Sequence, residues 1–366
     1  MSATGFLDAC GFFPAAGGTA DFVVSAAITG YQTPASAGAV NGAVYSYRAQ
    51  SSDMSEWEIG FGAYATGTTT LARTTVVASS TGSKINFSSP PAIYITALSA
   101  DLWKAINARD VLTANRTYYV RADGNDTNNG LSNTSGGAFL TIAKALSTVA
   151  SLDLGGFTAT VQVGAGTWTG TVSLPKILGG SAILIGDETT PSNVILSASS
   201  NWCVSALNID CTWDVRGFKL TSTGSSVHGL LGLSGNINYQ NIEFGSCTGS
   251  HVWAGANSLM AATAGTSISG GAQWHWYAES GGAITDRGVT ITLTGTPAFS
   301  SSFAEARTCA IVSVGVNTFV GGATGKRYNA ASSGVIEVYG AGTSYIPGSV
   351  AGTGTNPGTS PYGLYV

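Results

Sequence analysis

Short runs of β-branched and aromatic residues alternate with polar turns along most of this chain. In the first part of the chain, runs with a period close to two occupy residues 22–24, 43–48, 56–60 and 92–96. Turn signals such as Asn41-Gly42 separate these runs at intervals of roughly 8–12 residues. Because short strands at this spacing are typical of antiparallel folds, the pattern predicts an antiparallel β-sandwich or barrel over residues 1–100.

Two segments carry the period of a helix. Residues 99–112 begin with Ser99, a candidate N-cap, and place Asp101 in the first turn. This pattern predicts a short linker helix, and we assign residues 101–116 to the linker. The second segment, residues 139–152, aligns on one face Phe139, Ile142, Ala143, Leu146 and Val149. A helix with one apolar face suits a lid over the open end of a larger structure, so this segment is predicted to be a capping helix.

From residue 158 onward, short apolar strands alternate with Gly, Ser, Thr and Asn turns. Residues 213–220 align with residues 237–244 at an offset of 24 residues. A parallel β-helix needs a repeat of about this size, because each turn consists of three short strands. The absence of intervening helices argues against α/β folds. We therefore predict a mainly β protein with a parallel β-helix over residues 117–339.

The C-terminal stretch, residues 340–366, is rich in Gly, Ser, Thr and Pro. It contains few apolar residues with which to build a core. We expect either a loosely docked tail or a segment that wraps around a neighbouring subunit.

Composition and charge exclude several classes of protein. Charged residues make up 9% of the chain, against about 25% in ordinary globular proteins, and the net charge is −4. Without a basic stripe, nucleic-acid binding is not expected. The 44% hydrophobic content argues against disorder. No apolar run approaches the roughly 18 residues of a membrane span, and the N-terminus lacks the pattern of a secretory signal, so no membrane insertion is expected.

Cysteines and acidic loops give no sign of a metal or cofactor. The five cysteines are scattered without C-x-x-C spacing and are expected to be buried thiols, although the odd number leaves an intermolecular bridge through Cys10 open. The loop over residues 123–128 offers oxygen ligands but lacks the Gly and Glu of an EF-hand. We expect its side chains to hydrogen-bond the local backbone.

No catalytic residue is assigned from the sequence. Glycoside hydrolysis needs paired carboxylates, and acidic residues are sparse in the predicted β-helix. Asp210 and Asp214 are four apart and would share a face of a strand, but we expect solvated structural roles. A Ser-His-Asp triad lacks the support of a G-x-S-x-G turn.

The most informative cluster is aromatic and polar. Two segments about one turn of the predicted β-helix apart contain the candidate glycan-binding residues His251, Trp253, Trp274, His275, Trp276, Tyr277 and Glu279. Strand alternation places Trp274 and Trp276 on one face, and His275, Tyr277 and Glu279 on the other. One face would belong to the core. The other can stack on sugar rings, or alternatively pack against another subunit.

The segment from Trp57 to Tyr64 (WEIGFGAY), followed by residues 71–80 (LARTTVVASS) and 84–87 (KINF), resembles a module of bacteriophage and prophage tail-fibre proteins. In that family the module attaches or spaces fibre domains. The resemblance implies that Trp57 and Tyr64 are core anchors. It also implies that Arg73 is a buried or interface ion partner, with Glu58 as the candidate counter-ion.

Two further segments carry a second resemblance. Residues 119–146 are similar to the opening of right-handed parallel β-helices of the pectin-lyase-like kind, with a strand, an Asp/Gly/Asn loop and a capping helix. Residues 325–348 resemble the C-termini of prophage β-helix fibre proteins. Proteins of this kind are usually homotrimers, so the resemblance implies a homotrimer.

The resemblances lead to an expectation for the whole chain. We expect a virion protein (a tail fibre, tailspike or head fibre) assembled in the host cytoplasm. Residues 1–100 would bind other virion proteins, and the β-helix would bind host cell-surface polysaccharide during adsorption. One alternative is a tailspike depolymerase that cleaves its receptor, and another is a structural spacer or decoration protein without a ligand.

Overall fold

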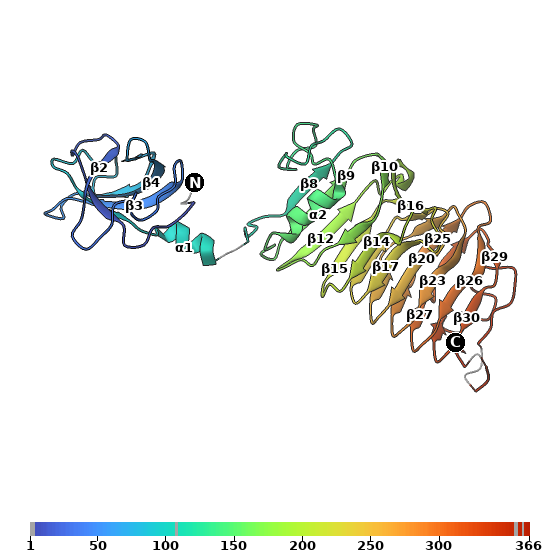
Figure 1. Ribbon diagram of the computed structural model, residues 1–366. Coiled ribbons are helices and arrows are strands. Elements are labelled where there is room, and N and C mark those ends of the chain that lie inside the picture. Colours follow the sequence, from blue (N-terminus) through green and yellow to red (C-terminus); the bar gives the residue numbers. More distant parts are fainter. Residues whose placement is uncertain (1–3, 107–108, 355–357, 361) are drawn as a thin grey trace. The chain divides into compact units, whose positions relative to one another are not determined.

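The structure is a computed structural model that describes residues 4–106, 109–354, 358–360 and 362–366 (Figure 1). The protein is mainly β. It divides into two compact units, residues 1–109 and 110–366, which are described separately.

The first unit is built on one antiparallel sheet. Its strands are β1 (Gly11–Pro14), β2 (Phe22–Ala27), β3 (Val44–Gln50), β4 (Trp57–Ala65), β5 (Thr70–Leu71), β6 (Thr75–Ser79) and β7 (Ala92–Ile95). They run in the order β3-β7-β1-β2-β5-β4-β6, and β3 also pairs with β4. This extra pairing closes the sheet on itself, as in a barrel, with Phe12, Tyr47, Tyr64 and Leu71 in the core.

Strand β4 contains Trp57 and Tyr64, the two residues expected to be core anchors of this unit. Its side chains alternate, with Glu58 and Tyr64 buried. Tyr64 is therefore a core anchor, as expected. Trp57 is 36% exposed and is not one, because it lies on the outward-facing set of the alternation.

Helix α1 (Ser99–Ile106) closes the described part of the first unit. The backbone N–H of Leu98 donates to the buried Asp101 carboxylate at 2.9 Å, which satisfies one of the free donors at the helix N-terminus. Residues 107 and 108 of the predicted helix 99–112 lie outside the described residues, and residues 109–112 are not helical, so the predicted C-terminal end of this linker helix was wrong.

The second unit is a parallel β-solenoid of about seven turns, in which each turn gives one strand to each of three sheets (Figure 1). Sheet 1 contains β8 (Arg116–Val120), β9 (Thr158–Val163), β12 (Ser181–Ile185), β15 (Thr212–Arg216), β18 (Asn236–Gln240), β21 (Leu259–Ala262), β24 (Ala283–Asp286), β27 (Ile311–Ser313), β31 (Val335–Glu337) and β32 (Leu364–Tyr365). Sheet 2 contains β10 (Gly166–Thr169), β13 (Val194–Ala198), β16 (Lys219–Ser222), β19 (Glu243–Phe244), β22 (Thr266–Ile268), β25 (Thr290–Leu293) and β28 (Thr318–Val320). A short 3-10 helix, Pro191–Asn193, precedes β13.

Sheet 3 carries the candidate site. It contains β11 (Val172–Leu174), β14 (Trp202–Leu207), β17 (His228–Leu233), β20 (Ser250–Gly255), β23 (Ala272–Ala278), β26 (Ala298–Ala306), β29 (Thr324–Gly325) and β30 (Tyr328–Ala330). Both β29 and β30 pair with β26. All pairings in the three sheets of the solenoid are parallel, as the sequence repeat predicted.

Inward-facing side chains stack from turn to turn. Trp213 is in register with Ile237, which confirms the offset of 24 residues. The same column continues through Met260 and Ile284 to Val312. Each of these side chains is fully buried, so the column forms a continuous apolar core along the solenoid.

Helix α2 (Ile142–Ala150) lies against β8, β9 and β11 at the N-terminal end of the solenoid (Figure 1). Thr141 caps the helix by accepting a hydrogen bond from the Lys144 N–H. The buried residues are Ile142, Ala145, Leu146 and Val149. Ala143, which the sequence placed on this face, is exposed instead.

The C-terminal residues close the other end, and the expectation of a loosely docked tail was wrong. Strand β32 pairs with β31, and the Tyr365 ring stacks on Tyr328 with centroids 3.7 Å apart. Ile346 is fully buried in the same core. The tail therefore adds a last partial turn to its own solenoid.

No helix within the described residues is long and apolar enough to cross a membrane.

Two isolated pairings, Lys326 with Val350 and Asn329 with Thr353, extend sheet 3 into the C-terminal segment. The solenoid is thus covered by a helix at one end and by its own chain at the other.

Candidate functional site

Each of three successive strands of sheet 3 bends at the same position, where two consecutive side chains point into the core. These pairs are His251–Val252 in β20, His275–Trp276 in β23 and Phe303–Ala304 in β26, all of them fully buried. A flat strand would send one residue of each pair outward. The bend brings together the outward side chains on its two sides, as shown by the Trp274 ring, which stacks on Tyr277 with centroids 4.5 Å apart.

Because of the bend, several residues of the aromatic cluster point in directions other than those predicted from strand alternation. His251, His275 and Trp276 have no exposed surface and cannot contact a ligand in this arrangement. The predicted pairing of Trp274 with Trp276 on one face was also wrong, because the bend separates them. Trp253, Trp274, Tyr277 and Glu279 lie on the outside of the sheet.

The two buried histidines form a neutral pair. His251 Nε2 lies 3.0 Å from the Gly245 carbonyl and must donate to it, so His251 Nδ1 accepts a hydrogen bond from His275 Nδ1 at 3.1 Å. Burial lowers the pKa of both rings, that of His251 to about 3. These histidines stabilise the core among Phe244, Phe299 and Phe303 and do not serve a surface site.

We call the outer side chains along this bend the elbow strip: Trp202, His228, Trp253, Trp274, Tyr277, Glu279, Glu305 and Arg307. They come from five successive strands of sheet 3 and the residues that follow them. Adjacent strands lie about 4.8 Å apart, so the strip is roughly 19 Å long. Trp202, His228, Glu305 and Arg307 were not predicted as site residues.

Trp274 is held flat at the centre of the strip. Its indole Nε1 donates to Glu305 Oε2 at 2.8 Å, and one face of its ring covers Tyr277, which is only 3% exposed. The exposed part of this half-buried tryptophan is therefore the opposite face of the ring. A flat aromatic surface fixed in this way can stack on the apolar face of a sugar ring.

The charged groups of the strip surround Tyr277. The Tyr277 hydroxyl donates to Glu279 Oε2 at 2.8 Å, and Arg307 forms an ion pair with the same carboxylate at 3.0 Å. The Arg307 guanidinium also lies over the Tyr277 ring at 4.9 Å. Burial raises the pKa of Glu279 above its ordinary value.

The other half of the strip is aromatic and uncharged. The Trp253 ring lies 4.5 Å from His228 and 5.5 Å from Tyr277. Burial lowers the pKa of His228 to about 4, so the ring is neutral at physiological pH. Its Nδ1 accepts a hydrogen bond from the Ser250 N–H at 3.0 Å.

Three buried polar groups on this outer face have no hydrogen-bond partner within the described residues. They are the indole N–H groups of Trp202 and Trp253 and the hydroxyl of Ser205. Leaving such a group unsatisfied costs about 1–3 kcal/mol. Partners from outside the chain, either ordered water or a bound molecule, would remove that cost.

The side chains of the loop at residues 123–128 bind backbone groups as predicted, but Asp126 binds those of a distant segment and not of its own turn. Asp126 accepts hydrogen bonds from the N–H groups of Leu140 and Thr141, both at 2.9 Å, and thereby ties the loop to the start of α2. Asn125 accepts from the Thr127 N–H. Within the described residues, no group of three or more His, Cys, Asp or Glu side chains is arranged to hold a metal ion.

The other residues that the sequence analysis considered are the acidic pair Asp210 and Asp214 and the five cysteines. Asp210 precedes strand β15 and pairs with Lys176, so it does not share a strand face with Asp214. All five cysteines are described and free. Cys10 is 2% exposed, and burial raises its pKa to about 11, so its thiol is not available for a bridge, whereas Cys309 is exposed.

Comparison with known proteins adds no relative: no family model, no curated protein and no solved structure matches this chain. The elbow strip is therefore interpreted from its own geometry. That geometry combines a fixed indole face, neutral aromatic neighbours and two carboxylates on a rigid sheet. Such a surface can bind a molecule that offers both apolar faces and hydroxyl groups.

Proposed function

We propose that this protein is a virion fibre or spike protein that binds host cell-surface polysaccharide through the elbow strip. The observation that carries the proposal is Trp274, fixed between Tyr277 and Glu305 with one ring face outward. A stacking surface held by neighbours loses little conformational freedom when a sugar binds. The sequence resemblance to phage fibre proteins supports the same function.

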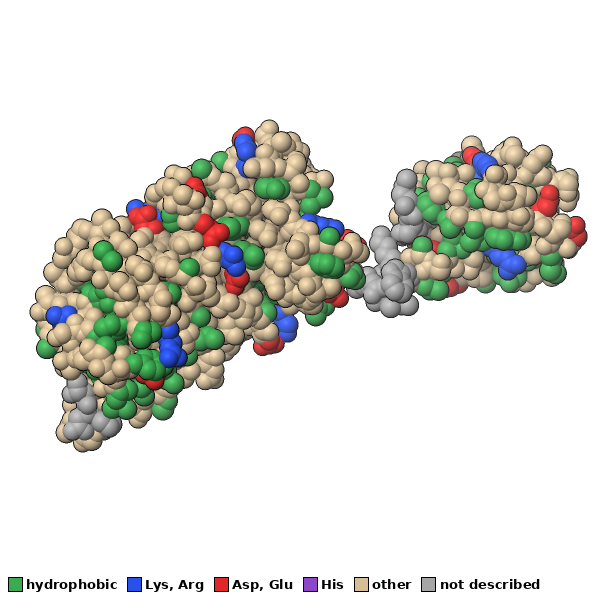
Figure 2. All heavy atoms as spheres, turned by 180° about the vertical axis from the view of Figure 1, so that it is seen from behind, with side chains coloured by type: hydrophobic (Ala, Val, Ile, Leu, Met, Phe, Trp, Pro, Cys, Tyr) green, Lys and Arg blue, Asp and Glu red, His purple; other side chains and the backbone are tan. Residues whose placement is uncertain are grey.

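The solenoid suits a polysaccharide better than a small molecule. A strip of roughly 19 Å presents aromatic rings from successive turns at the strand spacing of about 4.8 Å, so a linear chain of several sugars can contact it along its length. Most of the surface seen in Figure 2 is uncharged, with scattered acidic and basic side chains. Binding would therefore depend on stacking and hydrogen bonds more than on long-range charge.

The first unit is proposed to attach the protein to other virion proteins. Its support is the match of residues 57–87 to the fibre module, together with the Glu58–Arg73 ion pair that the match implied. The protein would then be located in the virion after assembly in the host cytoplasm.

We also propose that the second unit associates as a homotrimer through an apolar stripe on sheet 1. The stripe consists of outward side chains in register on successive turns: Leu259, Ala283, Ile311, Val335 and Leu364. Leu259 is 38% exposed and Ile311 is 45% exposed. Association would cover this stripe and would present three elbow strips, so that weak contacts with a polysaccharide add up.

The test is binding of the full chain to polysaccharide prepared from candidate host cells. We expect Trp274→Ala to weaken binding at least tenfold, because it removes the stacking face. Trp57→Ala is the matched control, since Trp57 is a partly exposed tryptophan of the first unit, and it should leave binding unchanged. Equal binding by the Trp274 variant and the wild type would refute the assignment of the strip.

One observation favours a second candidate, a depolymerase. Glu305 is in register with Tyr277, and Glu279 lies two residues after Tyr277, directly beyond the end of β23. From the strand geometry the two Cα atoms are roughly 8 Å apart, which lets the carboxyl groups reach the separations of about 5–9.5 Å found in glycosidases. The raised pKa of Glu279 suits a general acid.

Release of reducing ends distinguishes the two candidates. A depolymerase would release them from the bound polysaccharide, and Glu279→Gln or Glu305→Gln would abolish release while binding persists. Binding without release would leave the adhesin function alone. Neither binding nor release, with a confirmed host, would favour the structural spacer.

A further inference from the structure

Glu305 is a carboxylate of the elbow strip that has no counter-charge. It is 7% exposed, and no described Lys or Arg forms an ion pair with it. Arg307, the basic residue of the strip, is paired with Glu279 instead. Buried carboxylates are rarely left unpaired, because a lone charge loses its hydration. The strip therefore carries one uncompensated negative charge, which lies at Glu305.

One oxygen of the Glu305 carboxylate is available to a ligand. The hydrogen bonds from Trp274 Nε1 at 2.8 Å and from Ser302 Oγ at 3.4 Å both end on Oε2. Oε1 accepts no hydrogen bond from any described residue, and it is not one of the enclosed polar atoms, so it is open to solvent. An oriented carboxylate oxygen of this kind can accept further donors without any change in the protein.

The open oxygen lies beside the exposed face of Trp274. An indole N–H points along the plane of its ring, so the Glu305 carboxylate is at the edge of the ring and covers neither face. Tyr277 covers the inner face, and the outer face is free. Aromatic faces attract cations, as Arg307 does over the Tyr277 ring at 4.9 Å. A cationic ligand can therefore contact the ring face and the carboxylate at once.

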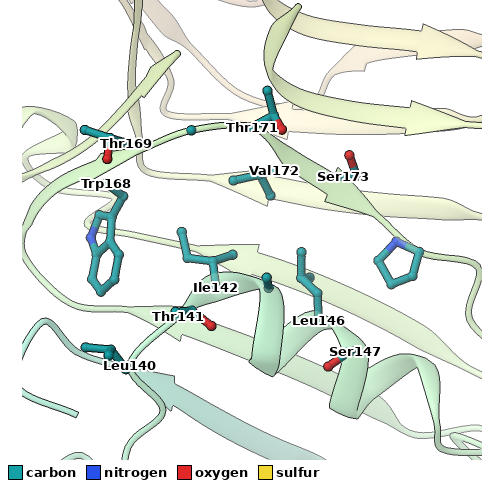
Figure 3. A pocket seen from close by; sticks show the side chains of 13 residues that line it. Leu140, Thr141, Ile142, Leu146, Ser147, Trp168, Thr169, Thr171, Val172 and Ser173 are labelled. Carbon is teal, nitrogen blue, oxygen red and sulfur yellow. The ribbon is translucent and has the colours of Figure 1, made fainter. Parts of the chain in front are cut away.

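The groove between helix α2 and the segment from β10 to β11 offers no such group. It has a volume of about 500 Å³, and Ile142, Leu146, Trp168 and Val172 form much of its wall (Figure 3). None of the residues that line it carries an ionisable side chain. A cation would lose hydration there without gaining a counter-charge. A positive charge is therefore better placed on the elbow strip.

We propose that the elbow strip selects a polysaccharide whose sugars carry free, protonated amino groups. This inference rests on the proposed function and names the substrate class of the same site. An ammonium group on a sugar stacked against Trp274 would donate a charge-assisted hydrogen bond to Glu305 Oε1. A hydroxyl or N-acetyl group can donate to the same oxygen but brings no charge, and a sugar carboxylate would be repelled.

The test is isothermal titration calorimetry of the full chain at pH 6, which keeps the amines protonated. The probes are tetramers of glucosamine and galactosamine, their fully N-acetylated forms, a galacturonic acid tetramer and tetralysine. We expect at least one amino-sugar tetramer to bind at least tenfold more tightly than its N-acetylated form and than tetralysine. Added salt should weaken binding of the amino form and leave that of the N-acetylated form unchanged.

Glu305→Gln keeps the size of the side chain and an oxygen acceptor for the Trp274 N–H, but removes the charge. It should bring binding of the amino-sugar tetramer down to that of the N-acetylated form. Glu337→Gln on sheet 1 is the matched control and should keep the tenfold preference. Trp274→Ala should weaken both forms, whereas Trp168→Ala in the groove should weaken neither.

Four results would overturn this selection. They are no binding of either amino-sugar tetramer, equal binding of the N-acetylated or acidic form, equal binding of tetralysine, and a preference that survives in the Glu305 variant. Each can occur while host polysaccharide still binds and Trp274→Ala still weakens it, in which case the proposed function stands without the selection. The proposed function itself fails when neither host polysaccharide nor any tetramer binds.

Discussion

The first unit is organised at the residue scale around a buried ion pair. The side chains of Glu58 and Arg73 have no exposed surface. Glu58 accepts hydrogen bonds from the Tyr47 hydroxyl at 2.7 Å and from the Ile85 N–H at 2.8 Å, while Arg73 also donates to the carbonyls of Ile85 and Gly18. Burial alone would raise the pKa of Glu58, but these hydrogen bonds outweigh it and hold the pKa below its ordinary value.

We predict that Arg73→Met lowers the free energy of unfolding of the first unit by about 3–5 kcal/mol, because it leaves a buried carboxylate without its partner. Equilibrium urea unfolding at pH 7, followed by hydrogen exchange of first-unit amides, measures this change. Arg48→Met is the control, since Arg48 is exposed, and it should stay within about 0.5 kcal/mol of the wild type. A similarly small effect at Arg73 would contradict the prediction.

The Glu58 network also has a defined pH dependence. Since the folded pKa is lowered, its stabilisation is present above the unfolded value of about 4.3 and is lost as the pH falls through the folded value. We expect the first unit of the wild type to lose stability below about pH 4, as measured by urea unfolding at pH 3 and pH 7. Glu58→Gln should flatten this dependence, and an unchanged slope would contradict the role of Glu58.

A second buried carboxyl behaves in the opposite way. Asp286 is 1% exposed in the solenoid core and accepts hydrogen bonds from the Trp276 indole at 2.7 Å, from the Ala262 N–H at 2.9 Å and from the Tyr239 hydroxyl. Burial raises its pKa to about 6 despite these bonds. A raised carboxyl pKa stabilises the fold at low pH, and this stabilisation is lost as the pH rises through 6.

We therefore predict that Asp286→Asn destabilises the solenoid more at pH 5 than at pH 8. The wild type gains about 1.4 kcal/mol between these two values when Asp286 takes up a proton, and the variant does not. Urea unfolding of both proteins, followed by hydrogen exchange of amides in sheet 1, measures the difference. The same difference in stability at both pH values would show that Asp286 does not titrate in this range.

At the scale of elements, the bend in sheet 3 requires a glycine in one turn. Gly229 in β17 precedes the core residue Leu230, as His251 precedes Val252 in the next strand. A Cβ atom at Gly229 would lie 2.5 Å from the His251 carbonyl oxygen. The backbone at His251 cannot move away from this Cβ atom without disturbing the pairing of β17 with β20.

Gly229→Ala should lower the stability of the solenoid by about 1–3 kcal/mol, the usual cost of an overpacked core position. Gly322→Ala is the control, because a Cβ there meets nothing within 4 Å. Thermal unfolding of the two variants side by side gives the comparison. Equal melting temperatures would mean that β17 and β20 adjust to the added methyl group without strain.

The repeat length of the solenoid strands could be predicted from the sequence, but the bend in sheet 3 could not. The match of Trp213 to Ile237 pointed to parallel turns, since stacked turns repeat the same inward positions, and the absence of intervening helices supported the same prediction. His275 and Trp276 both point into the core and therefore break the alternation expected for a flat strand. Their position depends on packing against Phe299 and Phe303 from the next turn. Glu305 joins Trp274 from a distant part of the chain, and no local pattern marks such a partner.

At the scale of the whole molecule, the apolar stripe on sheet 1 is the surface on which assembly can be tested. We predict that Ile311→Glu reduces the mass in solution from that of an assembly to that of a single chain, because a charge would have to be buried between copies. Ile183→Glu is the matched control, since Ile183 also faces outward on sheet 1 but lies beside Asp214 and outside the stripe. Light scattering after size-exclusion chromatography measures the mass.

Either of two results would reject the stripe as the interface. A wild-type chain that is monomeric at micromolar concentration excludes stable self-association under those conditions. An Ile311 variant that keeps the assembled mass would place the interface elsewhere on the molecule. In both cases the elbow strip and its binding test are unaffected, because they lie on a different sheet.

The closed ends of the solenoid have a consequence for how such a molecule changes over generations. Each inner turn pairs only with the turn before it and the turn after it, while α2 and the C-terminal segment cover the two ends. Duplication or deletion of one complete turn therefore alters the length by about 4.8 Å and requires no new contact at either end. The length of the solenoid can therefore change in discrete steps of one turn, while the remaining turns keep their pairing and their side chains.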